Sequence, residues 1–239
     1  MLFVSVKLKE YPDGTKKYYV YKKPYLKIDN TALDNVNFEN CDSNENEDDK
    51  KHSEYMNMIR SKNKIKDYCL SNDFDMFWTL TFASDREDDK KCFNRLSEWL
   101  KYMKKKFGLF DYIFIPERHK DGCIHFHGVT GGFGGEVVQA SHKGRLIYHN
   151  GEQVYNCSNW RYGHSTITMI RDRYKTASYI TKYITKDLSK KVVGKGKKKY
   201  WASRGLKLPV VKYLDYNPLS GCNPDWENDN IQIFNVYTV

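Results

Sequence analysis

Hydrophobic and polar positions alternate over residues 2–8, which predicts a β-strand. A turn signal follows at residues 11–14, and residues 18–21 return as a second strand. Four further strands are predicted from short apolar, β-branched or alternating runs, at residues 77–82, 111–116, 124–129 and 165–170. Residues 200–203 and 210–214 are candidates for late strands.

Helical spacing of apolar residues separates these strands. Residues 53–70 predict a strongly basic helix, residues from a cap at Ser84 or Asp85 to Gly108 predict a second helix, and residues 174–188 predict a third. Two histidines and a carboxylate, described below, lie on the strands between them.

The order of these elements is strand, helix, strand, strand, insertion, strand, helix and strand. This order predicts an α+β fold, with an antiparallel sheet and helices mainly on one face. We expect an N-terminal β-hairpin at 1–28, an acidic linker or loop at 29–51 and a basic helix at 52–71. The main domain then covers 72–214 with an insertion at 131–163, and a C-terminal extension covers 215–239.

The formal net charge is +10 and the pI is about 9.1. A positive charge of this size favours a nucleic-acid partner, because Lys and Arg release condensed counterions from phosphates. A soluble basic protein with another role has the same charge, so charge alone does not decide. The six cysteines are scattered without metal-ligand or redox spacing, and no stretch predicts a signal peptide or membrane span. We therefore expect a reducing, cytoplasmic location.

The sharpest local pattern is Gly122-Cys-Ile-His-Phe-His-Gly128. Side chains alternate faces along a strand, so His125 and His127 project to the same side and can hold one metal ion. A hairpin turn at 121–122 brings Glu117 back beside them, and a carboxylate with two imidazoles suits Mn²⁺ or Mg²⁺. His119 is the rival third ligand. A pair of surface histidines on an edge strand has the same sequence.

The predicted helix 174–188 carries a second candidate group. Tyr179, Lys182, Tyr183 and Lys186 recur at helical spacing on one face, opposite an apolar stripe. A phenol close to an ammonium is suited to nucleophilic attack on a phosphodiester. A solvated face of an amphipathic helix has the same spacing.

The runs at 77–82, 125–127 and 179–183, in this order, resemble the three motifs of His-hydrophobe-His endonucleases. The closest resemblance is to the rolling-circle replication initiators of plasmids and small single-stranded DNA phages, over residues 73–188. The resemblance implies a ferredoxin-like (split βαβ) core. It also implies a divalent metal held by the two histidines and an acidic residue, a 5′-phosphotyrosyl intermediate, and later rejoining of the strand.

Carried over by position, the resemblance assigns His125, His127 and Glu117 as ligands, Tyr179 as nucleophile and Lys182 as its partner. Tyr183 matches the second tyrosine of two-tyrosine members, and the two tyrosine roles are interchangeable at this stage. DNA-binding candidates are Lys186, Arg145 and Arg161, and Lys197 and Lys198 in a basic loop.

No phosphate-binding loop follows the tyrosine helix, so unwinding is expected to need a host helicase, and synthesis a host polymerase. Alternatives are a transposase with the same chemistry, a hydrolase without a covalent step, and an origin-binding protein that does not cut.

Overall fold

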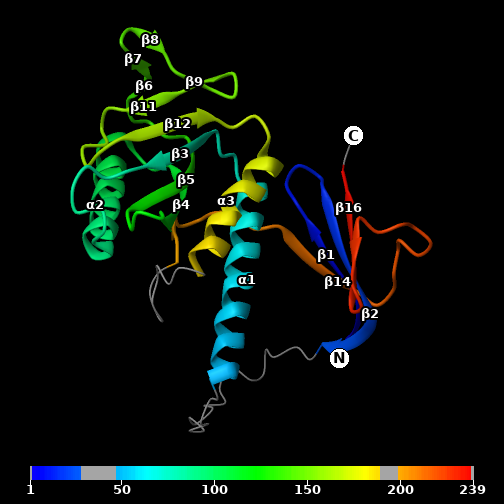
Figure 1. Ribbon diagram of the computed structural model, residues 1–239. Helices are drawn as coiled ribbons and strands as arrows, with labels where there is room; N and C mark the ends of the chain where they lie inside the picture. The colour runs from blue at the N-terminus through cyan, green and yellow to red at the C-terminus, as the bar shows by residue number, and fades with distance from the viewer. Residues whose placement is uncertain (1, 28–46, 189–198, 238–239) are drawn as a thin grey trace. The chain divides into compact units, whose positions relative to one another are not determined.

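The computed structural model of the protein describes residues 2–27, 47–188 and 199–237 (Figure 1). Contacts between residues divide the chain into two units. One unit contains Met1–Lys51 and Leu208–Val239, and the other contains His52–Lys207. Across the described residues, no helix is both long and apolar enough to cross a membrane.

The unit His52–Lys207 is built on a seven-stranded sheet, in the order β13-β4-β5-β3-β12-β11-β6, with antiparallel neighbours throughout. The strands are β3 (Met76–Leu80), β4 (Asp111–Arg118), β5 (Ile124–Gly131), β6 (Val137–Gln139), β11 (Tyr155–Cys157), β12 (Ser165–Met169) and β13 (Trp201–Ala202). The α+β class and the antiparallel sheet are confirmed. Inside the sheet, β5 lies between β3 and β4.

One face of this sheet is covered by α2 (Asp89–Phe107), which links β3 to β4. Its buried residues Leu96, Trp99 and Met103 belong to the same core as Trp78 and Phe126 of the sheet. The helix begins later than the sequence predicted, because its N-cap is Asp88, whose carboxylate accepts a hydrogen bond from the Lys91 backbone nitrogen at 3.0 Å. It ends at Gly108, as predicted.

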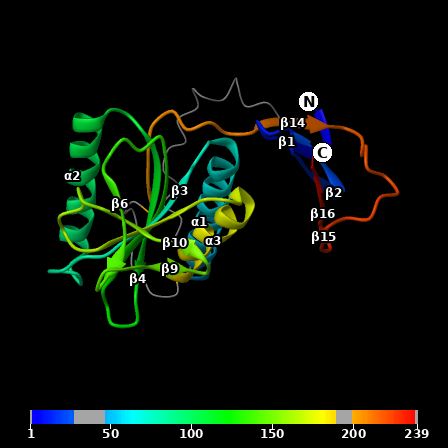
Figure 2. The same cartoon turned by 90° about the horizontal axis from the view of Figure 1, so that it is seen from above.

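The opposite face is covered by α3 (Arg173–Leu188), which packs against β4 and β5. Figure 2 shows α2 on one side of the sheet and α3 with α1 (Glu47–Ser71) on the other. Helices therefore cover both faces of the sheet, α1 and α3 on one and α2 on the other, whereas the sequence predicted them mainly on one face. The physical reason is visible in β4, where six consecutive residues are buried, so that both faces of the strand require a cover.

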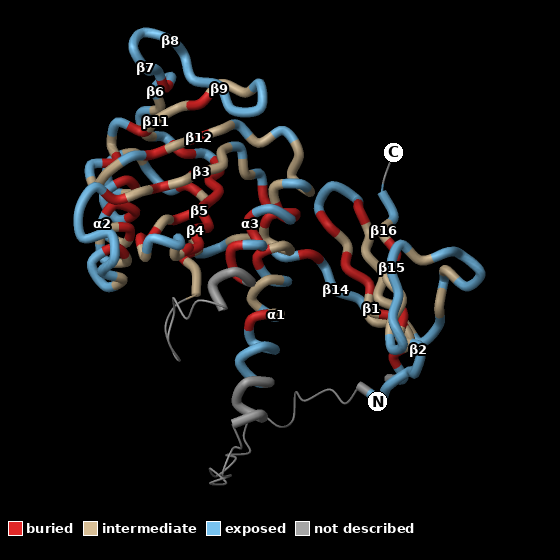
Figure 3. The backbone as a smooth tube through the Cα atoms, viewed as in Figure 1, coloured by how far each residue is buried: buried red, intermediate tan, exposed pale blue. Residues whose placement is uncertain are grey.

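Buried residues gather on the central strands of this unit (Figure 3). Gly128 of β5 is required by this packing, because a Cβ there would lie 2.7 Å from the Ile113 carbonyl oxygen and still closer to the Phe114 ring. A side chain at Gly128 would therefore displace β4 from β5, and with it the register between Glu117 and the two histidines.

The insertion before β12 forms two small hairpins beyond β6 and β11. They pair β7 (Ser141–His142) with β8 (Arg145–Leu146) and β9 (Tyr148–His149) with β10 (Glu152–Gln153). Asn150 and Gly151 both have positive φ at the tip of the second hairpin, which is typical of an Asn-Gly turn.

The unit Met1–Lys51 with Leu208–Val239 is a five-stranded antiparallel sheet, in the order β14-β1-β2-β16-β15. Its strands are β1 (Leu2–Glu10), β2 (Lys16–Lys27), β14 (Val210–Leu214), β15 (Trp226–Glu227) and β16 (Ile231–Val236). Val6, Val20 and Phe234 form its small core. The sequence had placed residues 210–214 with the main domain, but they pair with β1 in this other sheet. The acidic linker was predicted at residues 29–51; residues 29–46 lie outside the described residues, and residues 47–51 belong to α1 instead of the linker.

Candidate metal and tyrosine site

The antiparallel pairing of β4 and β5 brings Glu117 to the histidines. Glu117 lies directly opposite His125, and Ile115 lies opposite His127. Residues that face each other across two strands share one face of the sheet, so Glu117, His125 and His127 all project toward the side that α3 covers. The turn at 119–123, with Gly122 at positive φ, closes this hairpin.

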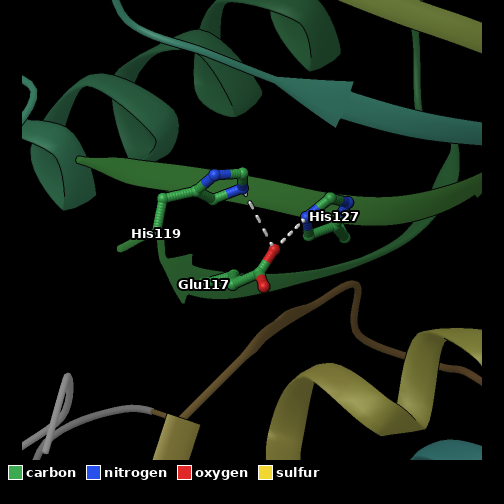
Figure 4. A group of neighbouring side chains, drawn as sticks. All are labelled: Glu117, His119 and His127. Carbon is green, nitrogen blue, oxygen red and sulfur yellow. Dashed lines mark hydrogen bonds and ion pairs between the residues drawn. The ribbon is translucent and has the colours of Figure 1, made fainter. Parts of the chain in front are cut away.

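Glu117 and His127 form a close group with His119, which lies at the start of the turn (Figure 4). The Glu117 carboxylate oxygen Oε2 lies 2.7 Å from His127 Nε2 and 3.4 Å from His119 Nε2. The ligand atoms of Glu117, His119 and His127 all lie within 4.8 Å of one another. Glu117 and His127 are buried, while His119 is exposed.

His125 is not part of that group of three. Its ring stacks on the ring of His119, with centroids 3.8 Å apart and planes 17° apart. Burial, together with the neighbouring imidazoles of His119 and His127, lowers the pKa of His125 to about 4. The structure thus brings together Glu117 and His127 from the predicted ligand set, with His119, the rival ligand, in the third place.

The donor set fits a divalent cation. A buried carboxylate within hydrogen-bond distance of a buried imidazole needs a compensating positive charge, and either a proton or a metal ion supplies it. One carboxylate and two imidazoles are ligands that Mn²⁺ accepts, and open positions would leave room for water or a phosphate oxygen. The group is therefore a candidate metal site.

The tyrosine helix lies directly against this group. The ring of Tyr183 stacks on the ring of His127, with centroids 3.7 Å apart and planes 9° apart. Tyr183 is buried at 8% exposure, and burial followed by its hydrogen bond with Tyr179 raises its pKa well above the usual range. A buried phenol in this position retains its proton.

Tyr179 lies one turn before Tyr183 and is 47% exposed. Its ring meets the Tyr183 ring edge-on at 5.3 Å and the Phe77 ring at 5.4 Å. The Lys182 ammonium lies over the Tyr179 ring, 5.7 Å from its centroid. Tyr179 is thus open to solvent, next to a cation, and joined through Tyr183 to His127.

Residues 75–188 match the sequence model of a family described as replication-associated protein ORF2. The matched segment is slightly less than half of the 239 residues and runs from β3 to the end of α3, so it contains every side chain of the site. It supports a replication-initiator family and, with it, a role in DNA replication. No curated protein and no solved structure matches the chain.

The predicted DNA-binding residues either lie apart from this site or have side chains outside the described part of the structure. Arg145 is exposed on the β7–β8 hairpin, beyond the opposite edge of the sheet from β4, and Arg161 is exposed just before β12. Lys186 lies in α3, but its side chain is outside the described set. Lys197 and Lys198 fall outside the described residues.

Sequence reasoning gave Thr79 no part in the site. On β3, Thr79 lies opposite His127, and its hydroxyl is 3.2 Å from His127 Nδ1. A metal at Nε2 requires the proton of the imidazole to be on Nδ1, where it would be donated to the Thr79 oxygen. The signal was the alternation of β3, which places Phe77 and Thr79 on the same face as the site.

We expect Thr79→Val to weaken Mn²⁺ binding by about 10- to 100-fold, which is typical when the outer partner of a metal-binding histidine is lost. Valine keeps the size and branching of threonine but cannot accept the Nδ1 proton. Isothermal titration with Mn²⁺ measures the effect. The matched control is Thr168→Val on β12, which lies opposite Phe77. Equal affinity in parent and Thr79→Val would show that Thr79 does not hold the ring.

Proposed function

We propose that this protein initiates rolling-circle DNA replication by nicking single-stranded origin DNA and later rejoining it. The observation that carries the proposal is the continuous contact from solvent-exposed Tyr179 through Tyr183 to His127 and the Glu117 carboxylate. The match of residues 75–188 to a replication-associated family supports the same role. A DNA-binding protein that does not cut has no use for such a contact between a nucleophile and a metal-ligating group.

Glu117, His127 and His119 would hold the metal, Mn²⁺ or Mg²⁺, while the His125 ring stacks on His119. When bound, the metal supplies Lewis-acid polarisation of the scissile phosphate. The chain orients the ligands through Thr79 and through the β4–β5 register.

In the proposed step, the Tyr179 phenolic oxygen attacks the phosphorus and loses its proton to solvent. The bond between phosphorus and the 3′ oxygen breaks, and that oxygen takes up a proton from water. The products are a 5′-phosphotyrosyl bond and a free 3′-hydroxyl, which primes synthesis. Lys182 stabilises the phenolate and the phosphate charge, and Tyr183 donates its hydroxyl hydrogen to the Tyr179 oxygen. Attack by a 3′-hydroxyl on the phosphotyrosine reverses the step and joins the strand.

The sheet supports the ferredoxin-like part of this proposal. Helix α2 joins β3 and β4, which lie on either side of β5, and this strand order supports the proposed split βαβ core. Because the sequence carries no phosphate-binding loop, a host helicase and a host polymerase are the proposed partners.

The test is to incubate the full-length protein with single-stranded DNA from its own origin and Mn²⁺, and to separate the products on a denaturing gel. We expect a protein–DNA adduct that survives boiling in detergent and is absent when a chelator is present. Cleaved DNA without an adduct would indicate simple hydrolysis. Binding with neither cleavage nor adduct would leave only an origin-binding role and would reject the proposal.

A further inference from the structure

The five-stranded sheet of the other unit has two chemically different faces. Because side chains alternate along each strand, Val6 and Val20 point to the face that carries the core with Phe234. Glu10 shares that face, where Lys212 and Lys16 pair with its carboxylate at 2.6 Å and 3.8 Å. Glu10 is thus kept on the core side and neutralised there.

The opposite face carries a row of residues that crosses all five strands. Lys7 pairs with Tyr213 on one side and Tyr19 on the other, and Tyr19 continues through Ile233 to Trp226. With neighbouring strands about 4.8 Å apart, the row from Tyr213 to Trp226 is about 19 Å long. We call this row and the residues beside it on the same face the aromatic-basic face.

Lysines surround the central tyrosine of this face. The Lys9 and Lys17 ammonium groups lie 5.7 Å and 5.3 Å from the Tyr19 ring centroid. Lys9 is buried, while Lys7 and Lys17 are partly accessible. Tyr21 lies one step along the same strand, on the same face, with the Tyr25 ring edge-on at 5.0 Å.

Acidic residues are absent from the described strand positions of the aromatic-basic face. Asp225, just before β15, accepts hydrogen bonds from the Asn235 backbone and side-chain nitrogens. Trp226 is 52% exposed at the edge of the row, and Tyr213 is partly exposed at the other end. The face therefore offers positive charge together with accessible aromatic rings.

We propose that the aromatic-basic face is a second binding surface for single-stranded DNA. Lysines neutralise phosphates, and Trp or Tyr rings stack on bases without regard to sequence. A duplex presents only base edges, so exposed rings favour a single strand. DNA is the expected strand because the other unit matches a replication-associated family. The surface lies outside the matched segment, and its binding requires neither the metal nor the tyrosine chemistry of the proposed function.

The experiment uses the full-length protein and a fluorescein-labelled 30-mer of dT, which contains no origin, in the presence of a chelator. We expect Trp226→Ala with Tyr213→Ala to raise the Kd at least about tenfold, because two stacking platforms are lost. Lys7→Ala should reduce the slope of log Kd against the logarithm of the salt concentration by about 0.7. The matched control, Lys212→Ala on the core face, removes the same charge and should leave the slope at the parent value.

Photo-crosslinking locates the contact independently of affinity. With 5-iododeoxyuridine in the 30-mer, mapped peptides should carry adducts at Trp226 or Tyr213. The proposal would be overturned by any of three results. The double variant could bind the dT 30-mer with an unchanged Kd. A duplex of the same length could bind the parent equally well and lose the same affinity in the double variant, or a U 30-mer could bind more tightly than the dT 30-mer. If the double variant loses dT binding but the parent does not nick origin DNA, the proposed function is rejected and this binding surface is kept. If the parent nicks origin DNA but the double variant binds dT as well as the parent does, the proposed function is kept and this binding surface is rejected.

Discussion

Replacing Tyr179 by phenylalanine is expected to abolish the covalent protein–DNA adduct and to lower the rate of strand cleavage by at least about 1,000-fold. The change removes only the nucleophilic oxygen, because the ring keeps its edge contacts with Phe77 and Tyr183. Tyr179 is chosen over Tyr183 on access. A phosphodiester reaches a half-exposed phenol, whereas the Tyr183 ring is enclosed and stacked flat on His127.

The companion variant Tyr183→Phe should keep the adduct but slow its formation by about 10- to 100-fold, the range expected from one lost hydrogen bond to a charged oxygen. The phenylalanine ring retains the stacking on His127, so the free energy of unfolding should change little. Tyr148→Phe is the control for tyrosine content, since Tyr148 is exposed on the β9–β10 hairpin. Quantifying the adduct on a denaturing gel over time gives both rates.

Two other outcomes assign the chemistry differently. If the adduct survives Tyr179→Phe and disappears with Tyr183→Phe, the nucleophile is Tyr183, and the helix must shift to expose it. If each single variant forms the adduct and only the double variant fails, both tyrosines act as nucleophiles. An adduct in the double variant would exclude both residues.

The strands around the site were predictable because each is a local pattern. The apolar runs at 77–82, 111–116 and 124–129 became β3, β4 and β5 with shifts of a few residues. The turn signal at 121–122 was sufficient to fold β4 onto β5, and so to bring Glu117 to the two histidines. Alternation along the strands then fixed which side chains share a face.

Features that depend on distant segments were not predictable from local patterns. Residues 210–214 have the composition of a strand, but only long-range pairing with β1 decides to which sheet they belong. The helices on both faces had a visible signal, the unbroken apolar run at 112–115, which indicates a strand buried on both sides. The prediction of helices mainly on one face was based on the order of the elements and did not take this apolar run into account.

The choice between His119 and His125 depends on the turn rather than on alternation. Strand parity places His125 beside Glu117, but it does not fix the direction of a ring. His119 lies just past the end of β4, where the backbone of residues 119–123 carries its ring toward the Glu117 carboxylate. Stacking of the two rings then leaves His119 within reach of the carboxylate and His125 behind it.

The second large effect concerns metal binding. Glu117→Gln should raise the Kd for Mn²⁺ by more than the 10- to 100-fold typical of outer-shell changes, because it removes the only anionic ligand of the group while keeping its size. His119→Ala is expected to weaken binding by less, since His119 is exposed and water can take its place. Isothermal titration and the electron paramagnetic resonance signal of Mn²⁺ report binding without any need for DNA cleavage.

His125→Ala separates the two possible ligand sets. If Glu117, His119 and His127 hold the ion, this variant binds Mn²⁺ nearly as well as the parent, and only the stacking against His119 is lost. If it loses Mn²⁺ as completely as Glu117→Gln does, the His125 ring turns into the site on binding and replaces or joins His119. Glu98→Gln on α2 is the control for the change of one carboxylate.

An ion that binds only the folded state stabilises that state by mass action. Mn²⁺ at 100 times the Kd should therefore raise the free energy of unfolding of the parent by about 2.7 kcal/mol, and its melting temperature should rise as well. Mn²⁺ should not stabilise Glu117→Gln. Equal stabilisation of both proteins would place the metal elsewhere in the chain.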